Sequence, residues 1–281
     1  MFQYAAGKAL SKRLNTLHIC DISSYQSDNL RNFSLSDFNI TSKVSGKNYY
    51  SKFKSRKSFT FWKNKILNIP VIHLNDPIWR LRHDFFLINK ATVLLTGYWA
   101  WSEYFENLKP LIADEFSLKQ NLQNELTSWC NNSILNNSVA VHIRRGDYLS
   151  TNEVKNFGII DFEYYYNSIK YLCSRLRNPI FYFFSDDIDW VDKNWLKEMK
   201  TLGTCIPVET NRINSPALEL KKMSMCENQI IANSSFSWWA AWLNQYPAKI
   251  VIQPKRWYNN KEWQKVYEEG SLNTNAGCIK I

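Results

Sequence analysis

The stretch with the most evident chemistry is SVAVHIRRGDY, residues 138–148, in which two adjacent arginines follow an apolar run. The apolar residues alternate with small or polar ones, which predicts a β-strand that delivers Arg144 and Arg145 at its carboxyl end. Two adjacent guanidinium groups repel each other, so burying them requires a strongly anionic partner. A diphosphate, which arginine can hold through paired hydrogen bonds, is one such partner. Since Arg-Arg is also common at a solvated sheet edge, this interpretation needs support from elsewhere in the chain.

That support comes from Ser234 and Ser235, which directly precede a predicted helix at residues 236–243. A helix start presents free backbone N–H groups and the positive end of the helix dipole, and both favour an anion. Taken alone, the serines predict only an ordinary helix cap. Together with Arg144 and Arg145, they predict a two-sided clamp for a diphosphate.

Asp186 and Asp187 follow a second predicted strand at residues 180–185. Their carboxylates could accept hydrogen bonds from the N–H groups of a base or from ribose hydroxyls, or they could cap the following helix. Paired aspartates can also bind a metal, but no third carboxylate or histidine lies at a suitable spacing, so we predict no metal. The chain has neither GxGxxG nor GxxxxGK[ST], which removes the main support for a dinucleotide-dependent redox enzyme or a P-loop protein.

Strands and helices are predicted to alternate after residue 138. Apolar runs predict strands at 139–143, 180–185, 205–208, 230–233 and 250–253, and helices at 162–176, 190–199, 217–226 and 236–243. This order indicates a parallel sheet covered on both faces, with ligands outside the carboxyl ends of the strands. Polar clusters follow four of these strands, the remaining one at residues 209–212. Three tryptophans at helical spacing are assigned to the core: Trp238, Trp239 and Trp242.

The first half of the chain is less regular. We predict a helix at 1–17, strands at 17–22 and 91–97, and helices at 103–115 and 118–130, with irregular structure across 28–70. A helix followed by a strand is the second half of a βαβ unit, so the first domain is expected to lack its first strand. The turn-rich segment NNSILNNS, residues 131–138, predicts a boundary between a first domain, 1–135, and a second domain, 136–281.

The amino-acid composition limits the classes of binding partner and the cellular compartment. The 281 residues carry 35 Lys and Arg against 25 Asp and Glu, and eight of these cations lie between residues 41 and 75 without any acid. This segment is either a solvated loop or a patch for anionic lipid head groups, with nucleic acid as a third possibility. The six cysteines form no CxxC pair, which indicates a reducing compartment. No apolar segment is long enough to span a membrane, so we expect a cytoplasmic protein with peripheral contact at the membrane face.

Three stretches together make the chain similar to glycosyltransferase family 11, the bacterial-type α-1,2-fucosyltransferases. HIRRGDY at 142–148 resembles the HxRRxD motif of that family, FSDD at 184–187 its second motif, and MSMCENQIIANSSFSWWAAWL at 223–243 its third. The opening MFQYAAGKAL and the GYW at 97–99 are also similar. The chain departs from the family in beginning after the glycine-rich GGLGNQ run, and in carrying Asn228 and Ala240 where histidine and glycine are common.

The resemblance implies a GT-B-like α/β fold with two Rossmann-type domains facing a cleft. It implies GDP-fucose as donor, a galactoside acceptor, inversion at the anomeric carbon, and no cofactor or obligatory metal. It places Arg144 on the diphosphate with Arg145 beside it. It also places His142 and Asp187 near the nucleoside, with Asp186 in the same donor site. Ser234 and Ser235 would lie near the phosphates.

The predicted function is therefore transfer of L-fucose from GDP-fucose to the 2-hydroxyl of a galactoside in a surface glycan or O-antigen repeat, whose acceptor can be lipid-linked. Arg144 would stabilise the leaving GDP, and Asp147 or Glu153 would accept the proton, with His142 as a weaker candidate. The alternative is a non-catalytic module that binds a GDP-sugar or a lipid head group, which the missing first strand and the basic segment favour. Nucleic acid is not the expected partner.

Overall fold

The structure is a computed structural model, and it describes residues 1–26, 33–49, 71–76, 80–89, 91–146, 154–209, 215–270, 272 and 278–281. The chain divides into two compact units, Met1–Ser117 and Leu118–Ile281. The boundary lies earlier than the predicted residue 135, because helix α6 (Gln120–Asn131) packs against helix α12 (Pro216–Met225) of the second unit. The turn-rich segment after α6 is therefore a connection within that unit.

The second unit is built on a parallel sheet, as predicted. Its described strands lie in the order β10-β9-β8-β5-β6-β7, and every neighbouring pair is parallel. The strands are β5 (Ser138–Ile143), β6 (Ile180–Ser185), β7 (Thr204–Pro207), β8 (Asn228–Ile230), β9 (Val251–Gln253) and β10 (Cys278–Lys280). The chain moves outward from β5 to β7, then returns to the other side of β5 for β8. The strand order therefore reverses between β5 and β8, the place where such sheets bind ligands.

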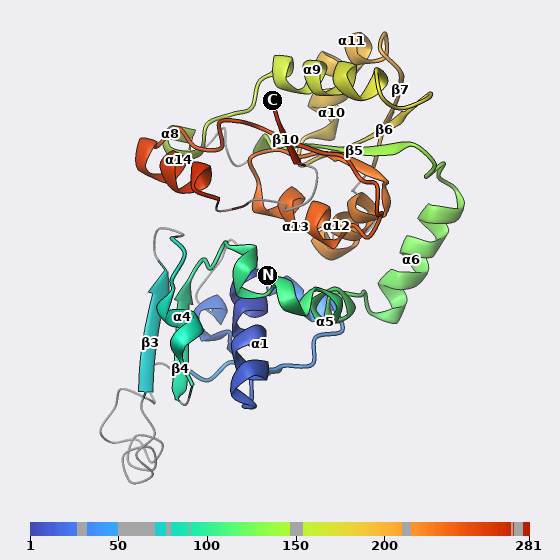
Figure 1. Ribbon diagram of the computed structural model, residues 1–281. Helices are drawn as coiled ribbons and strands as arrows, with labels where there is room; N and C mark the ends of the chain where they lie inside the picture. The colour runs from blue at the N-terminus through green and yellow to red at the C-terminus, as the bar shows by residue number, and fades with distance from the viewer. Residues whose placement is uncertain are drawn as a thin grey trace. The chain divides into compact units, whose positions relative to one another are not determined.

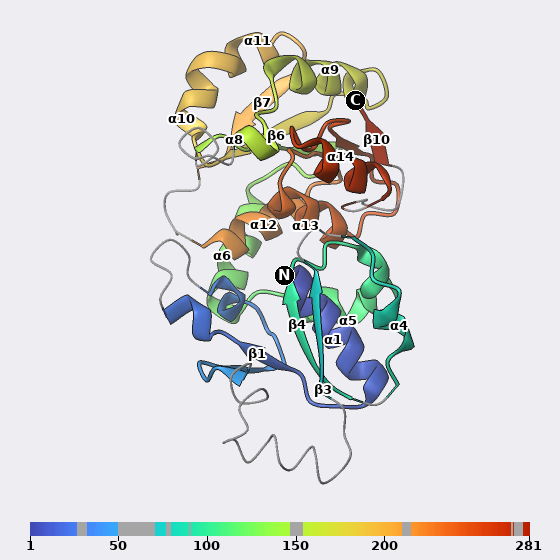
Figure 2. The ribbon, with the colours of Figure 1, turned by 90° about the vertical axis from the view of Figure 1, so that its left-hand side faces the viewer.

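Helices cover both faces of this sheet (Figures 1 and 2). One face carries α9 (Phe162–Cys173), α10 (Ile188–Val191) and α11 (Lys197–Met199); the other carries α12 and α13 (Ser235–Leu243). Asp161 and Ser215 are the N-caps of α9 and α12, since each side chain accepts a backbone N–H of the first turn. The short α8 (Val154–Phe157), α14 (Lys261–Glu268) and β10 were not predicted, because their sequences are polar or short.

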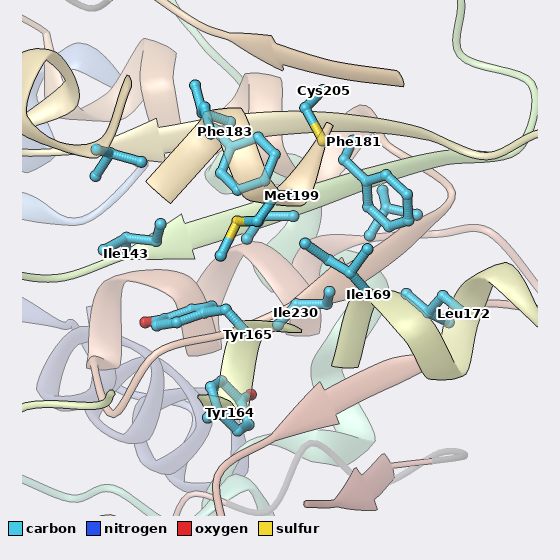
Figure 3. Close-up of a cluster of buried hydrophobic side chains, with 14 of the residues drawn as sticks. Ile143, Tyr164, Tyr165, Ile169, Leu172, Phe181, Phe183, Met199, Cys205 and Ile230 are labelled. Atoms are coloured by element: carbon cyan, nitrogen blue, oxygen red, sulfur yellow. The ribbon is translucent and has the colours of Figure 1, made fainter. Parts of the chain in front are cut away.

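The core between the sheet and α9 is apolar, with aromatic rings among mainly aliphatic side chains (Figure 3). Side chains of β5 and β6, such as Val141 and Phe183, pack there with Ile169 of α9. Each large apolar side chain buried in this way stabilises the fold by about 1.5–3 kcal/mol. On the opposite face the three tryptophans of α13 are at most 2% exposed, which confirms their assignment to the core: Trp238, Trp239 and Trp242.

A turn of π-helix, η5 (Asp192–Leu196), separates α10 from α11 where a single α-helix was predicted. A π turn spaces backbone bonds five residues apart, so side chains at positions i and i+5 come together. Trp190 and Trp195 are such a pair, with ring centroids 5.1 Å apart. Trp195 also packs against Tyr165 of α9, at 5.6 Å. The π turn thereby joins two helices through a continuous row of rings.

The described residues of the first unit form two small parallel sheets. Strand β1 (Ile19–Asp21) pairs with β2 (Lys43–Ser45), and β3 (Val71–Asp76) pairs with β4 (Thr92–Gly97). Its other described elements are α1 (Phe2–Leu14), α4 (Asp84–Leu87), α5 (Lys109–Glu115) and the short 3₁₀ turns η1 (Ser23–Gln26), η2 (Ser34–Asp37), η3 (Ser102–Tyr104) and η4 (Glu106–Leu108). The predictions of α1, β1 and β4 are confirmed. Strands β2 and β3 were missed, and the single helix predicted at 103–115 was wrong, because that segment breaks into η3, η4 and α5.

A buried polar network ties α1 to α5, and we name it the Lys8 cluster. Its members are Tyr4, Lys8, His18, Thr41, Ser42 and Glu115. Lys8 Nζ lies 2.7 Å from Glu115 Oε1, and the hydroxyls of Tyr4 and Thr41 also donate to the Glu115 carboxylate. Lys8 is 7% exposed and Glu115 only 1%.

No helix of the described residues combines the length and apolarity that crossing a bilayer requires.

Candidate active site

Strand register places Arg144 beside Asp186. Ile143 lies opposite Ser185 at the last pair of β5 and β6, so the next residues of both strands leave the sheet at the same edge. Arg144 Nη1 is 2.9 Å from Asp186 Oδ2, and the backbone N–H of Arg145 donates to Asp186 Oδ1 at 2.9 Å. Both oxygens of this carboxylate are thus engaged by the arginine pair. The side chains of Arg144 and Asp186 remain 29% and 24% exposed.

Arg145 is held quite differently from its neighbour. Its guanidinium carbon lies 3.2 Å from the ring centre of Trp190, a cation–π contact with the indole face. Its Nε lies 3.5 Å from Asp187 Oδ2, an ion pair in which Nε makes no hydrogen bond within the described chain. Only 17% of the Arg145 side chain is exposed. The predicted pair of arginines therefore splits, because Arg144 is accessible and Arg145 is packed on protein.

His142 lies at the second-last position of β5 and is 3% exposed. Burial, and then the positive charge of Arg144, lower the pKa of this histidine to about 3, so the ring is neutral. Its ring packs against that of Phe236, with centroids 5.6 Å apart. Its buried Nδ1 has no hydrogen-bond partner in the part of the chain that the structure describes.

Helix α13 begins shortly after strand β8, which pairs with the strand that precedes Arg144, β5. Val141 of β5 is opposite Ile230 of β8, and α13 begins a few residues after β8. Ser234 is the N-cap, with its hydroxyl accepting the backbone N–H of Phe236 at 3.3 Å, and Ser235 is the exposed first residue of the helix. The packing of Phe236 against His142, two positions before Arg144, shows that this helix start lies near the end of β5. The predicted helix-start anion site thus coincides with the reversal of strand order.

Two predicted groups cannot be placed in this site. Asp147 and Glu153, the candidate bases, lie outside the described residues, as do three residues of the cluster at 209–212. Asp187 is placed, at the residue before α10, but its side chain caps no amide of that helix in the described structure. Its backbone N–H instead donates to the hydroxyl of Ser185 at 3.1 Å. The capping interpretation is therefore wrong for Asp187.

Three residues of this region were missed from the sequence. Glu219 of α12 is one: burial, and then the charge of Asp186, raise the pKa of its carboxyl to about 7. The others are Tyr165 and Trp190, whose aromatic side chains follow a core pattern. Only their positions near the carboxyl edge of the sheet could have singled them out. The described residues include no group of three or more His, Cys, Asp or Glu side chains able to hold a metal ion, so the metal-free site stays a prediction.

The model of Glycosyl transferase family 11 matches residues 53–273 of this chain. The chain belongs to glycosyltransferase family 11. It is 32% identical to an α-1,2-colitosyltransferase of Escherichia coli over 271 residues, covering 93% of this chain and 89% of that protein. It is 30% identical to the O-antigen biosynthesis glycosyltransferase WbnK of Escherichia coli over 299 residues, covering 97% and 96%. The chain is therefore a glycosyltransferase, as predicted.

The chain is also similar in sequence to mammalian proteins and, in fold alone, to a plant protein. A galactoside 2-alpha-L-fucosyltransferase, SEC1 of Bos taurus, is 27% identical over 177 residues, which cover 61% of this chain and 46% of that protein. The structure of the Arabidopsis thaliana FUT1 mutant R284K in complex with GDP superimposes with a TM-score of 0.52 at 9% identity, covering 89% of this chain and 66% of that chain. This likeness confirms the predicted GT-B-like α/β fold.

Proposed function

We propose that this glycosyltransferase moves L-fucose from GDP-fucose to the 2-hydroxyl of a galactoside. The observation that carries the proposal is that Arg144 and the start of α13 follow two neighbouring strands, β5 and β8, at the reversal of strand order, where the rings of His142 and Phe236 pack together. An accessible guanidinium and the positive end of a helix dipole suit the diphosphate of a nucleotide sugar. The family resemblance and the name of the Bos taurus relative support the fucosyl donor.

The proposed reaction is a single displacement. The acceptor hydroxyl attacks the anomeric carbon from the face opposite the diphosphate, its bond to carbon forms, and the bond from carbon to the diphosphate oxygen breaks. GDP leaves with its developing charge stabilised by Arg144 and the first amides of α13. The acceptor hydroxyl gives its proton to a carboxylate, for which Asp147 and Glu153 are the proposed candidates.

The contacts of the arginine pair suggest separate roles for Asp186, Asp187 and His142 in donor binding. Because both oxygens of Asp186 hold the backbone and side chain of the arginine pair, we assign Asp186 to orienting Arg144. Asp187, with 38% of its side chain exposed, is better placed to accept hydrogen bonds from the nucleoside. His142 offers a neutral ring with a buried Nδ1 for the same nucleoside.

A second donor deserves a direct comparison, since one relative is named an α-1,2-colitosyltransferase. Colitose differs from L-fucose in lacking one ring hydroxyl, at carbon 3. A site that hydrogen-bonds this hydroxyl would discriminate strongly against colitose, whereas an apolar site would accept both sugars.

The test is transfer from each donor by the purified chain. The protein is incubated with GDP-fucose or GDP-colitose and a β-galactoside, and released GDP and the linkage of the product are measured. A fucosylated product linked at the 2-hydroxyl is the expected result. Transfer from GDP-colitose alone would reassign the donor. Binding of GDP without transfer from either donor would favour the non-catalytic module instead.

The acceptor and its location form a separate part of the proposal. The relative WbnK is named for O-antigen biosynthesis, which supports a surface polysaccharide repeat as acceptor. A lipid-linked repeat would bring the enzyme to the cytoplasmic face of the membrane. Cosedimentation of the full chain with vesicles of anionic phospholipid, compared with neutral vesicles, tests this peripheral contact.

A further inference from the structure

Two adjacent tyrosines of α9 are both buried, but their hydroxyls differ. The hydroxyl of Tyr164 donates towards the backbone carbonyl oxygens of Ile231 and Ile252, at 2.7 and 3.1 Å. The hydroxyl of Tyr165 is buried as well, yet it has no hydrogen-bond partner in the described structure. Tyr165 as a whole is 0% exposed. A buried hydroxyl without a partner is costly, and phenylalanine would fill the same space without that cost.

The direction of the Tyr165 side chain points to a role. In Figure 3 its oxygen lies at the end of the core cluster where Ile143 lies, which is the carboxyl end of β5. The residues that leave the sheet at this edge are Arg144 and Asp186. The charge of Asp186 is also felt at the phenol: after burial, it is the next cause that raises the pKa of Tyr165. The unpartnered hydroxyl is therefore aimed at the proposed donor site.

Donor binding would change what surrounds Asp186. Its Oδ2 is neutralised by Arg144, while its Oδ1 accepts the backbone N–H of Arg145. If the diphosphate draws the Arg144 guanidinium away, Oδ2 loses its ion-pair partner, and the Asp186 side chain is only 24% exposed to water. An unpaired charge in such surroundings costs free energy unless another donor replaces the lost one. The nearby Glu219, whose pKa is raised to about 7, could donate only in its protonated form and not above that pH.

We propose that Tyr165 is a positioning residue for donor binding, whose hydroxyl donates to Asp186 Oδ2 when the diphosphate takes Arg144. The inference rests on the proposed function, because it assumes that Arg144 binds the diphosphate. The hydroxyl thus gains its hydrogen bond in the donor complex. Tyr165 thereby favours the bound arrangement of Arg144 without touching the sugar nucleotide.

A second carboxylate near the phenol is the alternative acceptor. Asp161, the N-cap of α9, also contributes to raising the pKa of Tyr165, and its Oδ1 already accepts the backbone N–H of Tyr164 at 3.0 Å. A bond to Asp161 would exist with or without the donor and would stabilise the fold in both states. The dependence on donor therefore separates the two acceptors.

The experiment compares Tyr165→Phe with the matched control Tyr164→Phe in the full chain. Binding of GDP is measured by calorimetry, and the melting temperature is measured with and without GDP. We expect Tyr165→Phe to bind GDP about tenfold more weakly, the size of a lost hydrogen bond to a charged group, with a melting temperature in the absence of GDP equal to or above that of the wild type. The control is expected to melt at a lower temperature and to bind GDP as the wild type does.

Two further measurements distinguish a role in donor binding from a purely structural effect of the substitution. In transfer assays Tyr165→Phe should raise the KM for the donor about tenfold with little change in kcat, because the lost bond forms on binding. Combined with Asp186→Asn, Tyr165→Phe should weaken GDP binding no further, since both changes remove the same bond.

The outcomes distinguish this inference from the proposed function. If the wild type binds GDP and Tyr165→Phe binds it equally well, the inference is wrong and the proposed function stands. If Tyr165→Phe melts at a clearly lower temperature without GDP, its hydroxyl is already bonded and the inference is also wrong. If the wild type does not bind GDP at all, both are wrong.

Discussion

The Lys8 cluster and the site around Arg144 each pair a cation with a carboxylate, but they satisfy their polar atoms to different degrees. Glu115 accepts from three donors and is 1% exposed. Burial alone would raise the pKa of Glu115, yet these hydrogen bonds outweigh it and leave that pKa below its ordinary value. Around Arg144, by contrast, the ion pair is about a quarter exposed, and three buried polar atoms have no hydrogen-bond partner in the described chain: His142 Nδ1, Arg145 Nε and the Tyr165 hydroxyl.

This difference indicates two different uses of buried charge. A network whose donors and acceptors are all paired stabilises one arrangement of the fold. A site that is open and incompletely paired can still gain hydrogen bonds, so a ligand can stabilise it further. Perturbed groups that gather at the carboxyl edge of a sheet are therefore better candidates for function than a deeper and stronger ion pair elsewhere.

The largest expected effect is on catalysis at Arg144. Arg144→Ala should lower kcat about 10³-fold or more, because it removes the charge that stabilises the leaving diphosphate. The unfolding free energy should change by no more than about 1 kcal/mol, since the pair with Asp186 is partly exposed. Transfer assays and chemical denaturation measure the two quantities.

Arg144→Lys is the matched variant for this prediction. It keeps the charge but loses the fork that binds two oxygens at once, so its activity should fall between those of the wild type and Arg144→Ala. Turnover by Arg144→Ala at the rate of the wild type would contradict the role of this arginine and remove the contrast between the two regions.

The next effect should appear in the stability of the Lys8 cluster. Glu115→Gln leaves the Lys8 ammonium buried without its counter-charge and should reduce the unfolding free energy by about 3 kcal/mol. Glu106→Gln is the control, because its pair with Lys109 has both side chains 35% exposed and should contribute less than about 1 kcal/mol. Denaturation of both variants measures the difference, and equal losses would show that burial does not distinguish these pairs.

The smallest effect concerns pH, because each region contains one histidine with a lowered pKa. Burial lowers the pKa of His142 to about 3 and that of His18 to about 4, against an unfolded value of about 6.5. The unfolded chain therefore binds more protons below pH 6.5, and stability falls as the pH falls towards the folded values. Between pH 6.5 and 5, the loss from each histidine should steepen from about 0.7 kcal/mol per pH unit towards about 1.4 kcal/mol per pH unit.

His142→Gln should remove its share of that pH dependence, and His18→Gln should remove a similar share. The measurement is the unfolding free energy at several pH values in this window. Comparing slopes cancels the constant cost of each substitution. A slope unchanged by both substitutions would mean that neither ring stays neutral in the folded chain.

The second unit was largely predictable because its strands are buried on both faces. Such strands form short apolar runs, and the polar residues after them mark the sheet edge, as the sequence around His142 and that around Ser234 illustrate. The arginine pair could be located in this way. The different environments of Arg144 and Arg145 could not be predicted from the sequence. The partner of Arg145 is Trp190, which lies after a different strand and is brought near only by folding.

The first unit was harder to predict because its helices and strands do not show a strong periodic pattern of apolar residues. Strand β2 is three residues long and has no buried residue, and β3 alternates between exposed and more buried residues but carries Asp76 at one of its two buried positions, so neither strand shows a clear apolar alternation. Glu115 was predicted only as a helical residue, since its contacts with α1 span more than a hundred positions. Tyr165 was hidden for a different reason, because one polar atom does not alter the aromatic pattern of a core helix.

The π turn between α10 and α11 has a consequence for how this site can vary among related chains. Trp190, on which Arg145 rests, meets Trp195 because that turn contains one more residue than an α-helical turn would. A relative with one residue fewer there would rotate Trp195 about 100° around the helix axis while every aromatic side chain was retained. Insertions and deletions in this short helix, rather than substitutions, are therefore the changes most able to realign the support of Arg145.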